Sequence, residues 1–483
     1  MENEKSGGSS IISNVLWKMA EQCLAQVVSL VVSVVLARLL LPDDYGIIAM
    51  VIVFITVANA FVTSGIPTAL IQKKDTDAVD FSSVFFFNIG LAVVLYAILF
   101  CCAPLIAQFY EAPILKPVVR VMGLNLLPGA LNSVQSAYVS RNMMFKKYFL
   151  STLSGTLGSG VVGILLAYSG AGVWALVFQN LMNVTINAVV LFFTIDWRPI
   201  RAFSWKRVSA LVKFGWKILF EGISNTVAGQ ISNLVIGKVY TSGDLGFYTK
   251  AQQFPNIVST NFSNAVSAVL LPAISKEQDD EKRVELLLRK SVRLASFVVF
   301  PMLTGLALVA EPLIRLLMTE KWLGCVPYMQ IYCLACAMTV GMIPRHQALN
   351  GTGRSDVFMY EHMFARILGF ILLFAVYKIS VMAVAWSSIF SGIAMVLTVM
   401  FTSKRFNGYG YWDQIRDVIP SIAGCLIMGI CVYPLSFLPM PDIAMLALQI
   451  TVGVAAYVLY GIVFKLEETQ LILGFLSRFL KKK

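Results

Sequence analysis

The chain has 483 residues, of which 58% are hydrophobic and only 13% are charged, and its mean hydropathy is +0.77. It carries 38 Lys and Arg against 26 Asp and Glu, which gives a formal net charge of +12. Soluble domains are about 45–50% apolar and about 25% charged. This composition therefore argues against a soluble enzyme, a disordered chain and a nucleic-acid-binding domain.

Apolar runs long enough to cross a bilayer recur along the whole chain. A hydrocarbon core of about 30 Å needs about 20 apolar residues in a helix, and these runs lack the alternation of barrel strands. The sequence predicts an all-α polytopic membrane protein with 14 transmembrane helices. The predicted spans are 14–37, 45–67, 82–107, 115–137, 148–169, 171–195, 214–237, 245–271, 293–317, 323–344, 357–377, 379–402, 417–438 and 442–464.

The two ends of the chain add an anchor and a surface segment to this pattern. The first predicted span is long and has no small-residue cleavage site after it, which indicates an anchor rather than a signal peptide. Residues 465–483 read as a short amphipathic helix with a basic tail, a pattern that favours the membrane surface.

Basic residues are distributed unevenly over the predicted loops. If the N-terminus is cytoplasmic, 29 of the 38 Lys and Arg fall on the cytoplasmic side and 8 on the other side, with Arg366 inside a span. Lys and Arg concentrate in cytoplasmic loops, so the distribution predicts cytoplasmic N- and C-termini. Most of the net charge is then explained by topology and contact with anionic lipid headgroups.

The chain contains an internal repeat with a shift of 200 residues. Spans 1–6 and 7–12 are predicted to form two six-helix units in the same orientation, a parallel repeat that is typical of transporters. The predicted organisation is 1–200 (spans 1–6), 201–405 (spans 7–12), 406–464 (spans 13 and 14) and 465–483 (the basic tail). The matching pairs include Glu21 and Glu221, Arg38 and Lys238, Asp44 and Asp244, and Gly46 and Gly246.

Polar side chains form stripes at helical spacing on spans 1, 2, 7 and 8, and we expect these stripes to wall a hydrated cavity between the two lobes. Alternatively, Ser and Thr hydroxyls bond across helices or to their own carbonyl groups. Glu21 and Glu221 could couple transport to protons or cations or pair with Lys18 and Lys217, and both interpretations stay open. The candidate polar or coupling residues are Glu21, Glu221, Gln26, Asn59, Asn225, Gln252 and Asn256.

Six basic residues are candidates for binding an anionic group such as a diphosphate. The alternative for each is snorkelling, in which a long basic side chain at a helix end reaches the interface. The candidates are Arg38, Lys238, Lys250, Arg366, Lys18 and Lys217.

Motifs for enzymatic chemistry are absent from the sequence. It has no phosphate-binding Gly-x-x-x-x-Gly-Lys-Ser/Thr loop, no Gly-x-Ser-x-Gly and no His-Glu-x-x-His. Cys333-x-x-Cys336 falls inside a span without a second ligand pair, so we expect no metal site. Small residues at 151, 155, 159 and 163 recur every four positions in the fifth span and predict close helix packing. We expect no catalytic residues and no cofactor.

Several segments resemble one family of membrane proteins. They are Leu16-Trp17-Lys18 with Glu21-Gln22, Leu36-Ala37-Arg38-Leu39-Leu40, Pro42-Asp43-Asp44-Tyr45-Gly46, Ala69-Leu70-Ile71-Gln72, Arg141 with Phe145-Lys146, Ile236-Gly237-Lys238, and Leu245-Gly246-Phe247-Tyr248 with Ala251. Together they resemble Wzx-type lipopolysaccharide and exopolysaccharide flippases of the multidrug/oligosaccharidyl-lipid/polysaccharide (MOP) exporter superfamily. The likeness covers nearly the whole chain and is strongest over 15–75 and 210–255.

The resemblance implies a fold and an activity. The fold is MATE/MOP-like and V-shaped, with two six-helix lobes plus two C-terminal helices. The activity is alternating-access transport of undecaprenyl-diphosphate-linked oligosaccharide from the cytoplasmic to the periplasmic face, with possible coupling to H⁺ or Na⁺. Arg38 and Lys238 match as motif residues and Glu21 as the span-1 carboxylate. The implied place is the bacterial inner membrane, with polysaccharide polymerases and glycosyltransferases of the same pathway as partners.

Two other functions compete with this one. A cation-coupled multidrug antiporter of the same superfamily should have an acidic cavity, whereas the candidate bases here outnumber the acids. A membrane glycosyltransferase or polymer ligase would need a large extramembrane loop, and the longest predicted one, about 275–292, is short.

Overall fold

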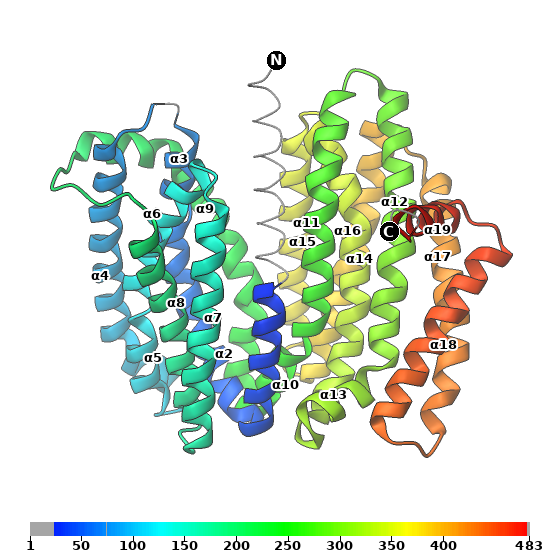
Figure 1. The fold of residues 1–483 in the computed structure, drawn as a ribbon, viewed down its shortest axis with the longest axis horizontal. Helices are drawn as coiled ribbons and strands as arrows, with labels where there is room; N and C mark the ends of the chain where they lie inside the picture. Colours follow the sequence, from blue (N-terminus) through cyan, green and yellow to red (C-terminus); the bar gives the residue numbers. More distant parts are fainter. Residues whose placement is uncertain (1–23, 74, 481–483) are drawn as a thin grey trace. The chain divides into compact units, whose positions relative to one another are not determined.

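The computed structural model describes residues 24–73 and 75–480, so predictions made for Lys18 and Glu21 lie outside the described residues. Every regular element among the described residues is a helix, as predicted (Figure 1). The chain divides into two compact units, residues 1–246 and 247–483, and each is described by itself.

The first unit is a bundle of helices joined mainly by short turns. After the helix Leu24–Leu39 come α2 (Pro42–Thr63), α3 (Ile66–Gln72), α4 (Ala78–Phe109), α5 (Leu115–Gly123), α6 (Leu126–Arg141), α7 (Phe145–Tyr168), α8 (Val173–Thr194) and α9 (Trp205–Val239). Helix α10 (Ser242–Ala251) crosses the boundary between the units. One apolar core joins α3, α4, α6, α8 and α9, with Phe81, Phe85 and Trp197 in ring contact at its centre.

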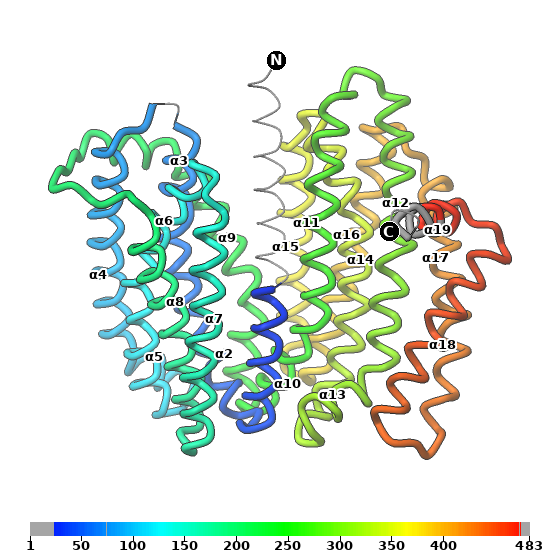
Figure 2. Tube along the Cα trace, in the orientation of Figure 1, coloured from blue at the N-terminus to red at the C-terminus, as the bar shows by residue number. Residues whose placement is uncertain are grey.

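The second unit continues with longer helices. They are α11 (Gln253–Lys276), α12 (Glu281–Leu308), α13 (Ala310–Met318), the 3₁₀ turn η1 (Glu320–Cys325), α14 (Val326–Gly351), α15 (Ser355–Val376), α16 (Val381–Asn407), α17 (Tyr411–Val432), η2 (Tyr433–Phe437), α18 (Asp442–Val463) and α19 (Glu467–Leu480). The trace in Figure 2 shows α19 lying crosswise to α17 and α18. Its first turn is tied to α12, because Arg293 Nε lies 2.8 Å from Glu468 Oε1.

Eleven segments of the described chain are long and apolar enough to cross a membrane. The predicted fourth span is not among them, because it breaks at Leu124–Asn125 into α5 and α6. Helix α9 is long enough, but polar residues along it, including Glu221, Asn225 and Gln230, make it less apolar than these segments. The described part of the first span, Leu24–Leu39, is a shorter apolar helix. A multi-pass membrane protein is thus confirmed.

One pair of residues matched by the 200-residue shift, Asp44 and Asp244, has similar local geometry. The backbone N–H of Leu41 donates to Asp44 Oδ2 (3.0 Å) at the start of α2, and that of Thr241 donates to Asp244 Oδ2 (3.3 Å) at the start of α10. The two segments also pack on each other within the first unit. A Cβ on Gly46 would collide with the Ser242 carbonyl, and one on Gly246 would collide with the Pro42 carbonyl.

The small-residue stripe of the predicted fifth span lies between α7 and α8, and its packing role is confirmed. A Cβ on Gly155 would press on the Asn183 carbonyl of α8. The stripe also carries hydrogen bonds between the helices, from Asn183 Nδ2 to Ser159 Oγ (3.2 Å) and from Ser151 Oγ to Asn187 Oδ1 (3.0 Å).

Charged side chains fasten the short α3 and the start of α9 within the first unit. Arg141 Nη1 donates to the last carbonyls of α3, including Ile71 O at 3.0 Å and Lys73 O at 2.6 Å. Arg207 on α9 pairs with Asp77, the N-cap of α4, and with the buried Asp80 at 3.3 Å. These contacts join three segments of the bundle that are far apart in the sequence.

Candidate functional site

The predicted site residue Lys238 lies in the last turn of α9 and is engaged in an ion pair. Its Nζ lies 2.8 Å from Glu111 Oε1 and 5.4 Å from the ring centroid of Phe109. Both charged groups line a cavity of about 490 Å³. The hydrogen bond from Lys238 holds the pKa of the Glu111 carboxyl below its ordinary value. Lys238 is therefore partly neutralised by a residue that the sequence did not single out.

A polar stripe on α9 is exposed along one face of the first unit. Lys217, Glu221 and Asn225 are four residues apart and all exposed, whereas Leu211, Gly215 and Ile236 of the same helix are buried. This places three predicted site residues together. Of the remaining first-unit candidates, Arg38 is exposed, and Asn59 and Gln26 are half-buried.

The second unit holds the other predicted residues, and it does not bring all of them together. Lys250 is 5% exposed, with its Nζ 5.9 Å from the ring centroid of the fully buried Trp322. Gln252 is half-buried where α10 meets α11. Asn256 is exposed at the start of a polar face that continues through Thr260 and Asn264. Arg366 lies apart from these, half-buried on α15.

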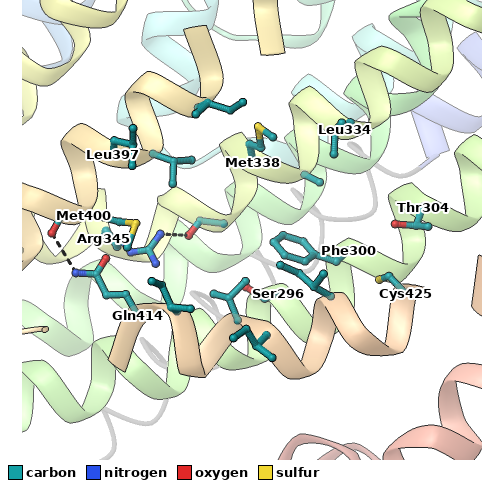
Figure 3. Close-up of a pocket in the computed structure, with 18 of the residues that line it drawn as sticks. Ser296, Phe300, Thr304, Leu334, Met338, Arg345, Leu397, Met400, Gln414 and Cys425 are labelled. Atoms are coloured by element: carbon teal, nitrogen blue, oxygen red, sulfur yellow. Dashed lines mark hydrogen bonds between the residues drawn. The ribbon is translucent and has the colours of Figure 1, made fainter. Parts of the chain in front are cut away.

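The second unit contains an apolar groove between α12, α14, α16 and α17 (Figure 3). Its volume is about 510 Å³. The walls are almost entirely aliphatic, aromatic and sulfur-containing, including Phe300, Met338, Leu397, Ile422 and Leu426. Such a lining suits a long apolar chain and excludes a hydrated sugar.

One end of the groove is polar. Arg345 and Gln414, which are 5% and 1% exposed, both line it, and Figure 3 shows them close together on α14 and α17. Gln414 Nε2 donates to Tyr409 O (2.7 Å), and Arg345 Nη1 donates to Gly341 O (3.2 Å). Arg345 Nε and Gln414 Oε1 are buried without a protein hydrogen-bond partner. Since buried polar atoms are nearly always paired, this end is suited to a polar ligand group.

Ion pairs hold α12 and α17 around that end. Arg289 Nε lies 3.0 Å from Asp417 Oδ2, and the Tyr409 hydroxyl donates to the same oxygen at 2.8 Å. Burial raises the pKa of Tyr409, so its hydroxyl stays protonated and remains a donor. The groove therefore has a polar end that is held by these contacts and an apolar body.

A second buried cluster was missed by the sequence reasoning. His346 on α14, Glu361 on α15 and Thr402 on α16 meet in the second unit, with His346 Nε2 3.5 Å from Glu361 Oε2. Thr402 Oγ1 donates to Glu361 Oε1. The sequence holds only two histidines, and no local spacing indicates that they meet.

Comparison with known proteins adds the family context. Residues 35–327 match a family model described as polysaccharide biosynthesis protein. The succinoglycan biosynthesis transport protein ExoT of Rhizobium meliloti is 25% identical over 86% of this chain and 83% of its own length. The lipopolysaccharide biosynthesis protein WzxC of Escherichia coli is 23% identical over 74% of this chain and 73% of its own length.

Solved structures show a matching fold. The lipid II flippase MurJ in an inward closed conformation aligns with a TM-score of 0.74 and 17% identity, over 93% of this chain and 98% of its own. An inward-facing MATE multidrug transporter of the MOP superfamily aligns with a TM-score of 0.64 and 12% identity, over 84% and 98%. At these identities the likeness concerns the fold.

Proposed function

Because the chain belongs to the polysaccharide biosynthesis protein family, we propose that it is a flippase that moves a lipid-linked oligosaccharide across a membrane. The observation that carries the proposal is the groove between α12, α14, α16 and α17, which is apolar along its walls and polar at the Arg345 end. An isoprenoid or acyl chain lies in such a groove without losing hydrogen bonds. The sugar needs a hydrated path instead.

We place the sugar and its phosphate groups along the exposed polar faces. In the first unit this face is the α9 stripe of Lys217, Glu221 and Asn225, and in the second unit it is the α11 face that begins at Asn256. Basic side chains attract phosphate oxygens, which keeps Lys217, Arg38 and Arg366 as proposed cargo residues, whereas Lys238 is already paired with Glu111. The buried Lys250 would need a local opening before it could reach a ligand.

The finer features of the transport cycle belong to the same proposal. We propose fourteen spans in all, with two six-helix repeats and two added helices, both termini cytoplasmic, in a bacterial inner membrane. The cargo carrier would be undecaprenyl diphosphate, delivered to the periplasmic face by alternating access. Glycosyltransferases would supply the cargo and a polymerase would consume it. The relatives are named for transport and biosynthesis of such polymers, which supports a transporter without enzyme chemistry.

A matched pair of substitutions on α17 tests the groove. Ile422 lines the groove, whereas Ile430, on the same helix, is 72% exposed and is not among its lining residues. We expect Ile422→Trp to fill the groove and lower cargo translocation several-fold in proteoliposomes, and Ile430→Trp to leave it unchanged. Equal membrane levels of both variants are the control. Normal translocation by Ile422→Trp would show that the groove does not bind the lipid chain.

A further inference from the structure

Both histidines of the 483-residue chain lie in one cluster of the second unit. The imidazole centroids of His346 on α14 and His362 on α15 are 5.1 Å apart, and Phe358 packs against both rings. Two histidines scattered at random would rarely meet. Their meeting beside a buried carboxylate points to proton chemistry, because imidazole is the side chain that titrates near neutral pH.

Glu361 is the centre of the cluster and is only 2% exposed. One oxygen accepts a hydrogen bond from Thr402 Oγ1 on α16, and the other lies 3.5 Å from His346 Nε2, a distance for an ion pair rather than a good hydrogen bond. An isolated buried carboxylate is costly. Two arrangements avoid this cost: a protonated Glu361 beside neutral His346, or an ionised Glu361 beside protonated His346.

Thr402 is placed to serve both arrangements. Its hydroxyl lies within hydrogen-bond distance of Glu361 Oε1 and also of two carbonyls of its own helix, Thr398 O (3.2 Å) and Val399 O (3.1 Å). When Glu361 is ionised, the hydroxyl donates to it. When Glu361 is protonated, its own O–H donates to Thr402, whose hydrogen turns to a carbonyl of α16. The hydrogen bond between Glu361 and Thr402 can therefore form whether Glu361 is protonated or ionised.

The other charged groups near the cluster favour release of the proton. On α14 the neighbour is Arg345, whose guanidinium lies 5.9 Å from the Tyr409 ring centroid. On α15 it is His362. On α16 the basic residues Lys404 and Arg405 lie instead over the rings of Tyr411 and Phe406. The guanidinium of Arg345, next to His346 in the chain, opposes a second proton on the cluster.

We propose that His346, Glu361 and His362 form the proton-binding site that couples cargo movement to a proton gradient; this rests on the proposed flippase function. The donor set argues for H⁺ over Na⁺, because Na⁺ is a hard cation and, like other hard cations, prefers oxygen ligands over imidazole nitrogen. Among the described residues, no group of three or more His, Cys, Asp or Glu side chains is arranged to hold a metal ion.

Packing connects the cluster to the groove. His346 follows Arg345, which lines the groove, and Thr402 lies two residues after Met400, another lining residue. Between them, Met342 of α14 and Met395 and Val399 of α16 form one buried contact with Ala365 of α15. A change in the Glu361–Thr402 hydrogen bond therefore acts on the same helices that hold the apolar chain.

The first experiment follows the protonation of each imidazole directly, because the chain has only two histidines and therefore only two sets of histidine signals. Full-length protein without a polyhistidine tag is labelled with nitrogen-15 histidine, placed in nanodiscs and titrated by NMR. We expect Glu361→Gln to shift the titration of His346 to lower pH, because the variant loses the carboxylate that stabilises the imidazolium. Glu311→Gln, on α13, removes a carboxylate that pairs with Arg315 and should leave the titration of both histidines unchanged. Identical titrations in the wild type and Glu361→Gln would overturn the proposal.

The second experiment separates coupling from transport itself. Proteoliposomes are loaded with lipid-linked oligosaccharide, and translocation is measured with a pH gradient, with a sodium gradient and with none. We expect the pH gradient to drive the wild type, and Glu361→Gln and His346→Asn to lose this drive while keeping gradient-free exchange. A wild type driven by sodium alone would overturn the proton site. A wild type that translocates nothing under any condition would instead overturn the flippase function.

Discussion

Asp44 and Asp244 occupy the same place in two helices that begin 200 residues apart. Each is the third residue of its helix, and each accepts a hydrogen bond from the backbone N–H three residues earlier. Asp244 has an additional partner, since the Thr241 hydroxyl donates to its Oδ2 at 2.7 Å. These family-like motif residues thus act as helix caps.

We expect Asp44→Ala and Asp244→Ala to lower the free energy of unfolding by about 1 kcal/mol each, the usual contribution of a side-chain hydrogen bond at a helix N-terminus. Asparagine can accept the same hydrogen bond, so Asp44→Asn and Asp244→Asn should preserve most of the stability. Thermal unfolding in detergent measures the effect. A loss of transport with unchanged stability would instead assign these carboxylates to cargo or ion binding.

The second prediction concerns the contact of α9 with α3. Gly65 has a φ of +80°, and a Cβ on Gly215 would press into its backbone carbonyl. Gly215→Ala should therefore destabilise the first unit, although alanine favours a helix over glycine. Gly229, on the same helix, has open space around its Cα. Gly229→Ala should stabilise by about 0.5–1 kcal/mol, and a similar response at both positions would contradict the close approach.

Whether a feature could be predicted from the sequence depends on how far apart in the chain the interacting residues lie. Helicity and the apolar spans depend on composition and local spacing, and the small-residue stripe of α7 depends on a four-residue period. The partners of the charged residues, in contrast, cannot be predicted from local spacing. Glu111 reaches Lys238 across 127 residues, and Glu361 reaches His346 only because α14 and α15 are rotated so that both side chains face inward. The packing of helix faces, rather than any local pattern, decides these contacts.

The third prediction tests Arg141 as the C-terminal cap of α3. One guanidinium nitrogen serves the carbonyls of Leu70, Ile71 and Lys73, and hydrogen bonds to a charged group contribute about 1.5–3 kcal/mol. We expect Arg141→Ala to lower stability by about 2 kcal/mol and to expose the loop after α3 to protease. Arg201→Ala, at an exposed position, is the control. Protection of the loop in Arg141→Ala would show that the carbonyls find other donors.

The fourth prediction is a pH dependence at the start of α4. The hydrogen bond from Arg207, followed by that from the Asp80 backbone, holds the pKa of Asp77 below its ordinary value. A lowered pKa means that the contribution to stability is complete above the ordinary Asp range and is lost as the pH falls through the folded-state pKa. Wild type should therefore lose stability more steeply than Asp77→Asn on acidification below the ordinary Asp range. Parallel unfolding midpoints for the two proteins across this acid range would refute the assignment.

The last prediction decides between two roles of Lys238 with a double-mutant cycle. If the residue serves mainly to tie α9 to Glu111, then Lys238→Met, Glu111→Gln and the double variant should reduce transport equally, because each removes the same contact. If Lys238 binds cargo phosphate, Glu111→Gln should strengthen cargo binding by freeing the ammonium, and Lys238→Met should abolish that gain. Since Lys238 lies 2.8 Å from Glu111 and is 37% exposed, we expect the first pattern. Added salt should weaken the Lys238–Glu111 ion pair in the wild type, because solvent ions screen an exposed pair.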